Sequence, residues 1–184
     1  MFIIRSKKFL LRYFKKGDEN SLIENINNKK IAKNTLRIPY PYKLKDARFW
    51  INRNLKLDKK KKRHEINFAI VINGEVVGGI GLDRIWQHCA EIGYWLGEKY
   101  WGQGIMTKVV KLATEYGFQK LGLRRIYAFV FIWNKASAKV LEKSGFKYEG
   151  KLRKHVKKGN KLFHVISGIL IQTRRDEFRR PCLP

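Results

Sequence analysis

The segment Ala90–Thr107, AEIGYWLGEKYWGQGIMT, constrains the fold more than any other part of the chain. Apolar side chains take every second position of Glu91–Leu96, as in a half-buried strand. Gly102 and Gly104 then allow a tight turn, and from Ile105 apolar residues recur at helical spacing. Free amides and the helix dipole attract anions at such a helix N-terminus. The segment therefore predicts a strand–turn–helix unit suited to a pyrophosphate.

Two common phosphate-binding motifs are absent from this turn. A dinucleotide fold requires G-x-G-x-x-G after an early strand and an acidic residue about 20 positions later, and neither is present. Thr107 and Lys108 stand in the wrong order for a Walker motif. Taken alone, the turn is also compatible with a purely structural connection between a strand and a helix. The choice depends on a second motif.

That second motif is NKASAKVLEKSGF, at Asn134–Phe146. With it in place, the turn resembles the signature Q/R-x-x-G-x-G/A of the GNAT N-acetyltransferases. The surrounding sequence is similar to their RimJ/RimL branch, which contains enzymes that acetylate the N-termini of ribosomal proteins. Three further stretches precede the turn in family order: FLLRYFKKGDENSL, IPYPYKLKDARFWI and INFAIVINGEVVGGIGL. The chain departs from the family pattern at Trp101 (usually Gln or Arg), Met106 (usually Gly or Ala) and His164 (commonly Asp).

The resemblance implies one GNAT domain over residues 1–184. Its fold would be α/β (α+β), with a mixed, mostly antiparallel twisted sheet flanked by helices and acyl-coenzyme A in a cleft where central strands splay. The residue pattern independently favours a three-layer α/β domain. Expected strands are 9–13, 66–72, 91–96 and 125–132, with hairpin turns at Asn73-Gly74 and Gly159-Asn160; expected helices are 19–32, 45–55, 105–121 and a short helix from Asn134 to Gly145.

Charge is the second informative property. The chain has 41 Lys and Arg against 15 Asp and Glu, a net charge of +26. Part of the excess lies in a basic loop at 58–64 and in a short C-terminal tail at about 174–184. Two explanations stay open: a solvated surface, or attraction to RNA or the ribosome.

Cellular location and assembly are expectations of a simpler kind. No apolar run approaches the roughly 18 residues that span a bilayer, and the first residues lack a cleavage site, so a cytoplasmic protein is expected. Cys89 and Cys182 fit no metal spacing, and we expect two reduced thiols and no metal site. Monomer and homodimer both stay open.

The resemblance also implies the residues that bind acetyl-coenzyme A. They belong to the strand end, the glycine turn with the first helical residues, and the second motif: Tyr94, Trp95, Leu96, Trp101, Gly102, Gln103, Gly104, Ile105, Met106, Thr107, Asn134, Ser137 and Lys143. Asn134 is also suited to cap a helix, and Gln103 and Lys143 are equally compatible with solvent-facing roles.

Acetyl transfer requires a polarised carbonyl, a neutral amine and a proton for the leaving thiolate. The resemblance places the carbonyl near the backbone N–H of Trp95 or Leu96, and Glu91 at a position that carries a base in some GNAT enzymes. Three histidines are rival bases: His88, His155 and His164. Leu141 occupies the position where many GNAT enzymes have an acidic tyrosine, while Ser137 matches a serine thought to give the sulfur a proton.

The predicted function is therefore direct transfer of an acetyl group to a primary amine, with the N-terminus of a ribosomal or other protein as the leading acceptor. A small-molecule amine acetyltransferase, acting on an antibiotic or polyamine, is the first alternative. A ribosome- or RNA-binding module that retains the acyl site is the second. The resemblance further implies that Ile38–Tyr42 and the helix with Phe49 and Trp50 form the wall beside the acetyl group.

Overall fold

The computed structural model describes residues 3–6, 8–58 and 64–171. The predicted basic loop 58–64 lies outside this part of the chain except for its two end residues, and the predicted tail at 174–184 lies outside it entirely. No helix in the described ranges has both the length and the apolar character needed to cross a membrane.

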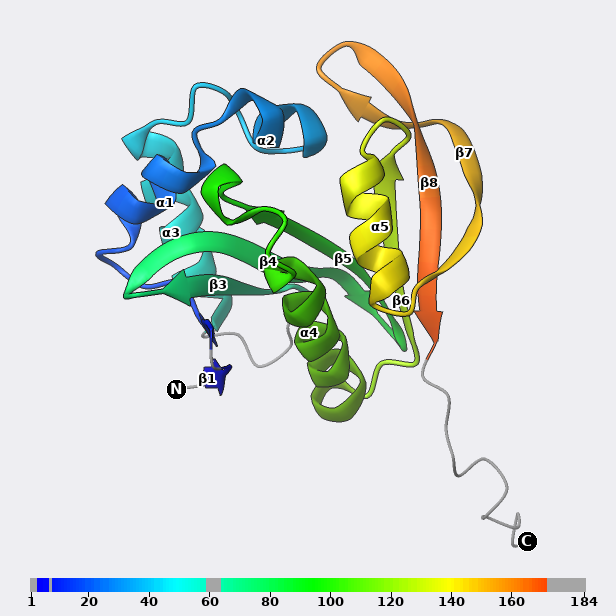
Figure 1. Ribbon diagram of the computed structural model, residues 1–184, viewed down its shortest axis with the longest axis horizontal. Coiled ribbons are helices and arrows are strands. Elements are labelled where there is room, and N and C mark those ends of the chain that lie inside the picture. Colours follow the sequence, from blue (N-terminus) through cyan, green and yellow to red (C-terminus); the bar gives the residue numbers. More distant parts are fainter. Residues whose placement is uncertain (1–2, 7, 59–63, 172–184) are drawn as a thin grey trace, which may run out of the picture.

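A single open sheet organises the described residues. It contains eight strands in the order β1-β2-β3-β4-β5-β6-β8-β7 (Figure 1). All neighbours are antiparallel except β5 and β6, which are parallel. The strands are β1 Ile3–Arg5, β2 Leu10–Arg12, β3 Ile66–Ile72, β4 Glu75–Trp86, β5 Cys89–Leu96, β6 Arg125–Phe131, β7 Lys147–Lys158 and β8 Lys161–Ile171. The predicted mixed, mostly antiparallel sheet is confirmed.

Helices cover both faces of this sheet. They are α1 Glu19–Ile26, α2 Lys29–Asn34, α3 Leu44–Asp58, α4 Ile105–Leu121 and α5 Lys135–Lys143, with the 3-10 helix η1 Glu98–Tyr100. Along β3, Phe68 and Ile70 join a core with α4, while the alternating Ala69 and Val71 join a second core with α1 and α3. Helices α4 and α5 therefore lie on one face and α1–α3 on the other, the predicted three layers (Figure 1).

Turn residues explain several boundaries. Asn73 and Gly74 have φ of 50° and 85°, as the expected type I′ hairpin turn requires. Helix α4 begins and ends at the predicted residues, because Gly104 and Gly122 adopt left-handed conformations (φ 70° and 67°) that stop it on both sides.

One predicted element was wrong, and one strand was not predicted. The first strand is preceded by the short strand β1, which pairs with β2. The predicted helix 19–32 is two helices, because Asn28 is extended and its side chain caps α2 by accepting from the amides of Lys30 and Ile31. Asparagine occurs inside helices as well as at their N-caps, so the residue type alone did not reveal the break.

Candidate active site

The site begins where two central strands separate. Strands β5 and β6 pair only from Cys89↔Arg125 to Glu91↔Tyr127. Beyond Glu91, β5 continues to pair with β4 on its other side as far as Leu96. The β6-facing backbone edge of residues 92–96 therefore lines an opening in the sheet.

The register decides which amides point into this opening. The Gly97 amide donates to the Val77 carbonyl at 2.8 Å, and the same register pairs Trp95 with Gly79. Hydrogen-bonded pairs recur at every second residue of an antiparallel ladder, so the Trp95 backbone faces β4. The backbone groups of Tyr94 and Leu96 face the opening. Of the two amides expected near the acetyl carbonyl, that of Leu96 therefore faces the opening and that of Trp95 does not.

A cavity of about 920 Å³ occupies the opening. It is lined from both faces of the sheet, by α4 and α5 on one side and by α3 and the segment after α2 on the other. All but one of the predicted cofactor residues line it, together with Glu91: Tyr94, Trp95, Leu96, Trp101, Gly102, Gly104, Ile105, Met106, Thr107, Asn134, Ser137 and Lys143. The exception is Gln103, whose side chain turns back to donate to the Lys99 carbonyl at 3.0 Å.

The glycine turn presents bare backbone at the N-terminus of α4. Gly102 and Gly104 have φ of 75° and 70°, and no atom lies within 4 Å of a Cβ built on either residue. The space over them is therefore open to a ligand. Trp101 holds this turn to the strand, because its indole N–H donates to the Leu96 carbonyl at 2.7 Å. In the sequence, the only sign of this contact was that Trp101 stands where the family usually has Gln or Arg.

Ser137 lies in the first turn of α5, beside Tyr94. The Tyr94 hydroxyl is 2.9 Å from Ser137 Oγ and donates to the Ser137 carbonyl at 3.2 Å. Asn134 Oδ1 accepts from the Ser137 amide at 3.2 Å, so the predicted capping role of Asn134 is confirmed. Burial raises the pKa of Tyr94 to about 12, which keeps its hydroxyl protonated at neutral pH.

Glu91 lies at the end of the β5–β6 pairing. Along β5, Ile92, Tyr94 and Leu96 belong to the α4 side of the core, and Trp95 packs on the other side. By this alternation Glu91 points to the α1–α3 face, opposite Ser137. Burial is the main cause that raises its pKa, and the like charge of Asp83 adds to it, against an opposing effect of Arg84.

No local sequence pattern predicted the group of charged residues around Glu91. Asp83 is its register partner on β4 and also lines the cavity. Arg84 Nη1 lies 2.9 Å from Glu91 Oε2, but without the alignment of a hydrogen bond, and that oxygen accepts none from the described residues. Arg37, from the segment after α2, pairs with Asp83 at 3.1 Å. This carboxylate pair is therefore partly compensated by arginines at its exposed side.

The three rival histidines do not line the cavity. His88 is exposed in the turn between β4 and β5. His155 packs its ring on Phe129, with centroids 4.6 Å apart. His164 Nδ1 accepts the Lys154 amide at 3.0 Å within the β7–β8 hairpin. Among the predicted bases, the geometry favours Glu91.

Aromatic residues line the α1–α3 side of the cavity. Of the wall predicted from the resemblance, Ile38, Tyr42, Phe49 and Trp50 line it. Phe49 is 70% exposed at this wall, whereas Tyr42 is buried. This side therefore offers an apolar surface next to Glu91.

A bridge joins α2 to the other side of the opening. Lys158, at the tip of the β7–β8 hairpin, donates to the Ala32 and Thr35 carbonyls at the C-terminal end of α2. The indole of Trp133, just after β6, donates to Asn34 Oδ1 at 3.2 Å. Both contacts tie elements on one side of the splayed strands to α2 on the other, a connection that sequence reasoning missed.

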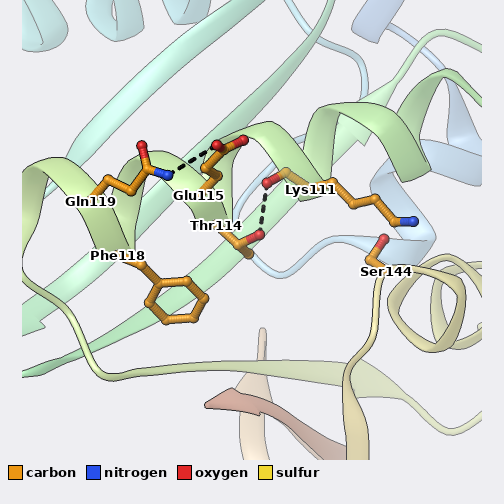
Figure 2. A pocket seen from close by; sticks show the side chains of 6 residues that line it. All are labelled: Lys111, Thr114, Glu115, Phe118, Gln119 and Ser144. Atoms are coloured by element: carbon orange, nitrogen blue, oxygen red, sulfur yellow. Dashed lines mark hydrogen bonds between the residues drawn. The ribbon is translucent and has the colours of Figure 1, made fainter. Parts of the chain in front are cut away.

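A second, smaller depression of about 300 Å³ lies along α4, away from the splayed strands (Figure 2). Three of its polar side chains already bond within the protein: Thr114 donates to the Lys111 carbonyl at 2.9 Å, Gln119 to Glu115 at 3.0 Å and Ser144 to the Val140 carbonyl at 2.8 Å. We interpret this depression as a packing seam.

Comparison with known proteins agrees with this geometry. The model of the acetyltransferase (GNAT) domain family matches residues 8–147. Among curated relatives, Bacillus subtilis YjcK, a probable N-acetyltransferase, is 39% identical over 105 residues, which cover 54% of this chain and 58% of YjcK. Bacillus subtilis YdaF, a putative ribosomal N-acetyltransferase, is 34% identical over 90 residues, 48% of this chain and 49% of YdaF.

The Escherichia coli (strain K12) spermidine N(1)-acetyltransferase is 34% identical over 91 residues, which cover 48% of each chain. The aligned part of this chain therefore spans only about half the length of these relatives.

Solved structures share the fold. RimL, a ribosomal alpha-N-protein acetyltransferase in complex with coenzyme A, superimposes with a TM-score of 0.81 at 24% identity, covering 92% of this chain and 98% of RimL. A ribosomal-protein alanine acetyltransferase from Vibrio fischeri gives a TM-score of 0.80 at 22% identity, with 98% and 100% covered. At these identities the likeness concerns the fold alone.

Proposed function

The chain belongs to the GNAT acetyltransferase family, and from this premise we propose that it transfers the acetyl group of acetyl-coenzyme A to a primary amine. The leading acceptor is the N-terminal amine of a ribosomal or other protein, which would place the reaction in the cytoplasm. The observation that carries the proposal is the opening between β5 and β6, where free strand amides and a glycine turn face one cavity.

The residues present fit acyl-coenzyme A. The amides at the start of α4, above the open space over Gly102 and Gly104, suit a pyrophosphate. Lys143 lines the same cavity and would add a positive charge near the phosphates. The amides of Tyr94 and Leu96 have no strand partner in β6 and would hold the pantetheine arm and the acetyl carbonyl. When bound, this group supplies a reactive thioester.

Three groups of the chain would then act on the reaction. A strand amide aimed at the developing oxyanion contributes about 3 kcal/mol in comparable sites. Glu91, on the opposite face of the sheet, would take the proton of the acceptor ammonium. Ser137 would donate a hydrogen bond to the leaving sulfur. The acceptor amine would enter along the aromatic side of the cavity, between Trp50 and Glu91.

A small-molecule acceptor remains the rival because the spermidine enzyme and YdaF match this chain over similar lengths at the same identity. The net charge of +26 argues against polyamines, since a field of this sign repels polycations. A ribosome- or RNA-binding module without catalysis is the third candidate.

The deciding experiment measures release of coenzyme A thiol from acetyl-coenzyme A. N-terminal peptides of ribosomal proteins, polyamines and aminoglycosides would be compared at one stated salt concentration. Peptide-dependent release is the expected result. Efficient acetylation of a polyamine or aminoglycoside, with inactive peptides, would select the small-molecule function. Coenzyme A binding without release on any amine would favour the non-catalytic module.

A further inference from the structure

We propose that Tyr94 is the positioning residue for Ser137: its hydroxyl holds the serine oxygen so that the serine proton points into the cleft, toward the leaving sulfur. This inference deepens the proposed acetyl transfer and rests on it. It assigns a task to the phenol on β5, which the reaction outlined above does not use.

The contact between the two residues crosses the opening in the sheet. Tyr94 belongs to β5, and Ser137 belongs to α5, which follows β6. Backbone pairing between β5 and β6 has already ended at Glu91. The Tyr94 hydroxyl, 2.9 Å from Ser137 Oγ and 3.2 Å from its carbonyl, therefore ties the strand edge to the helix at the point where the sheet no longer does so.

Only one of the two contacts has a direction fixed by its groups, and the direction of the other is part of the proposal. The Ser137 carbonyl can only accept, so Tyr94 is the donor in that contact. In the proposed arrangement the single phenol proton is shared in a three-centre hydrogen bond between this carbonyl and Ser137 Oγ. The serine proton is then free for another acceptor in the cavity that both residues line. A hydroxyl that accepts a hydrogen bond also becomes a better donor. Burial keeps the Tyr94 hydroxyl protonated, so it remains a donor across the working pH range.

No other side chain of α5 carries a hydroxyl that could donate a hydrogen bond to the leaving sulfur. Ser137 is the only hydroxyl-bearing residue between Lys135 and Lys143, and the helix contains no tyrosine. The Ser137 amide donates to the capping residue Asn134, and the Ser137 side chain contacts the Tyr94 hydroxyl. Two contacts from different elements thus fix both the position and the orientation of one hydroxyl.

Acetyl transfer forms one bond to carbon and breaks another. The acceptor nitrogen forms the C–N bond while the C–S bond breaks, and the bonding electron pair moves to sulfur. The Ser137 hydroxyl donates a hydrogen bond to that developing thiolate. Glu91 first takes the ammonium proton and passes it to solvent, and the nitrogen loses its second proton to the same base as the C–N bond forms. The sulfur gains one proton from solvent. Tyr94 stays protonated throughout and acts only through Ser137.

The first test is a double-mutant cycle with Tyr94→Phe and Ser137→Ala. Tyr94→Phe removes only the hydroxyl, and we expect kcat for thiol release to fall at least fivefold while the Kd of acetyl-coenzyme A changes less than twofold. Because Tyr94 acts through Ser137, the double variant should be no slower than Ser137→Ala. Unchanged kcat in Tyr94→Phe, or losses that multiply in the double variant, would overturn the inference.

A second measurement does not depend on turnover. A hydroxyl that donates to sulfur stabilises the thiolate, so it lowers the thiol pKa of bound coenzyme A. Followed by thiolate absorbance, this pKa should be higher in Tyr94→Phe and Ser137→Ala than in the wild type. Equal values in all three proteins would contradict the inference even if no amine is acetylated. Tyr148→Phe, an exposed tyrosine on β7, is the matched control, and unfolding midpoints report whether each variant folds.

If the wild type binds coenzyme A and shows the lowered thiol pKa but acetylates nothing, the proposed function fails and the role of Tyr94 stands. If the wild type does not bind coenzyme A, both fail together. Normal turnover of Tyr94→Phe removes the role of Tyr94 and leaves the proposed function intact.

Discussion

At the residue scale, Glu91 has the property most directly tied to activity, a carboxyl whose pKa is raised by burial. A general base must be deprotonated, so kcat/KM should rise with pH through this pKa, above the value of about 4.3 of an ordinary glutamate. Glu91→Gln should lower kcat by about 10²–10⁴-fold and abolish this rise. A pH profile of thiol release checks both; an unchanged profile would exclude Glu91.

The raised pKa of Glu91 also affects stability. Activity should rise with pH, whereas the contribution of Glu91 to the free energy of unfolding should fall. Its pKa is higher in the folded than in the unfolded chain, so its contribution to stability is present below the unfolded pKa and is lost as pH rises through the folded one. Glu91→Gln should therefore not lower the free energy of unfolding at neutral pH. Urea unfolding at acidic and neutral pH measures the difference between the two proteins, which should favour the variant more at the higher pH.

The ion pair of Arg12 and Asp18 is a second feature of single residues. Two hydrogen bonds of 2.7 Å join them, and both side chains are buried. Breaking such a pair leaves an uncompensated buried charge, so Asp18→Asn should lower the free energy of unfolding by about 3–5 kcal/mol. The exposed pair of Lys99 and Glu24 is the control, and Lys99→Ala should leave the urea midpoint unchanged.

At the element scale, the bridge between α2 and the β7–β8 hairpin shapes the acceptor side of the cavity. Lys158→Met keeps the apolar stem of the side chain but removes its bonds to the end of α2. Amide exchange in α2 should then accelerate roughly tenfold, the equivalent of one charged hydrogen bond of about 1.5 kcal/mol. Because residues 34–38 line the cavity, the KM of the acceptor should rise while coenzyme A binding stays unchanged.

Lys157→Met is the matched control for this prediction, since Lys157 is exposed on the same hairpin. Hydrogen exchange and steady-state kinetics on both variants separate a local effect from a general effect of charge. Equal exchange rates in α2 for Lys158→Met and the wild type would show that the bridge does not restrain this helix.

At the scale of the whole molecule, the net charge of +26 predicts salt-dependent association with RNA. Anisotropy of a labelled ribosomal RNA fragment should give a log K that falls linearly with log salt, by about 0.7–0.9 per neutralised phosphate. Replacing three exposed lysines of β7 by Gln should reduce this slope; they are Lys147, Lys151 and Lys157. Binding without salt dependence, or none at low salt, would leave the charge as a solvated surface.

Local patterns account for most of the elements and for the identity of the family. The limits of α4 follow from the two glycines that flank it, Gly104 and Gly122, and the Asn73-Gly74 turn follows from two adjacent residues. The break at Asn28 escaped prediction because asparagine occurs both within helices and at their N-caps, and only the extended backbone reveals the cap.

The sequence by itself determined the strand–turn–helix unit, the second motif and therefore most of the residues around the cavity, because periodicity, caps and turn chemistry act within short windows. The tertiary structure alone decided that the Trp95 amide faces β4, that Tyr94 contacts Ser137 and that Lys158 donates to the C-terminal end of α2. These three facts depend on strand register and on where β5 and β6 separate. Both are set by contacts between residues far apart in the chain, which a local pattern does not encode.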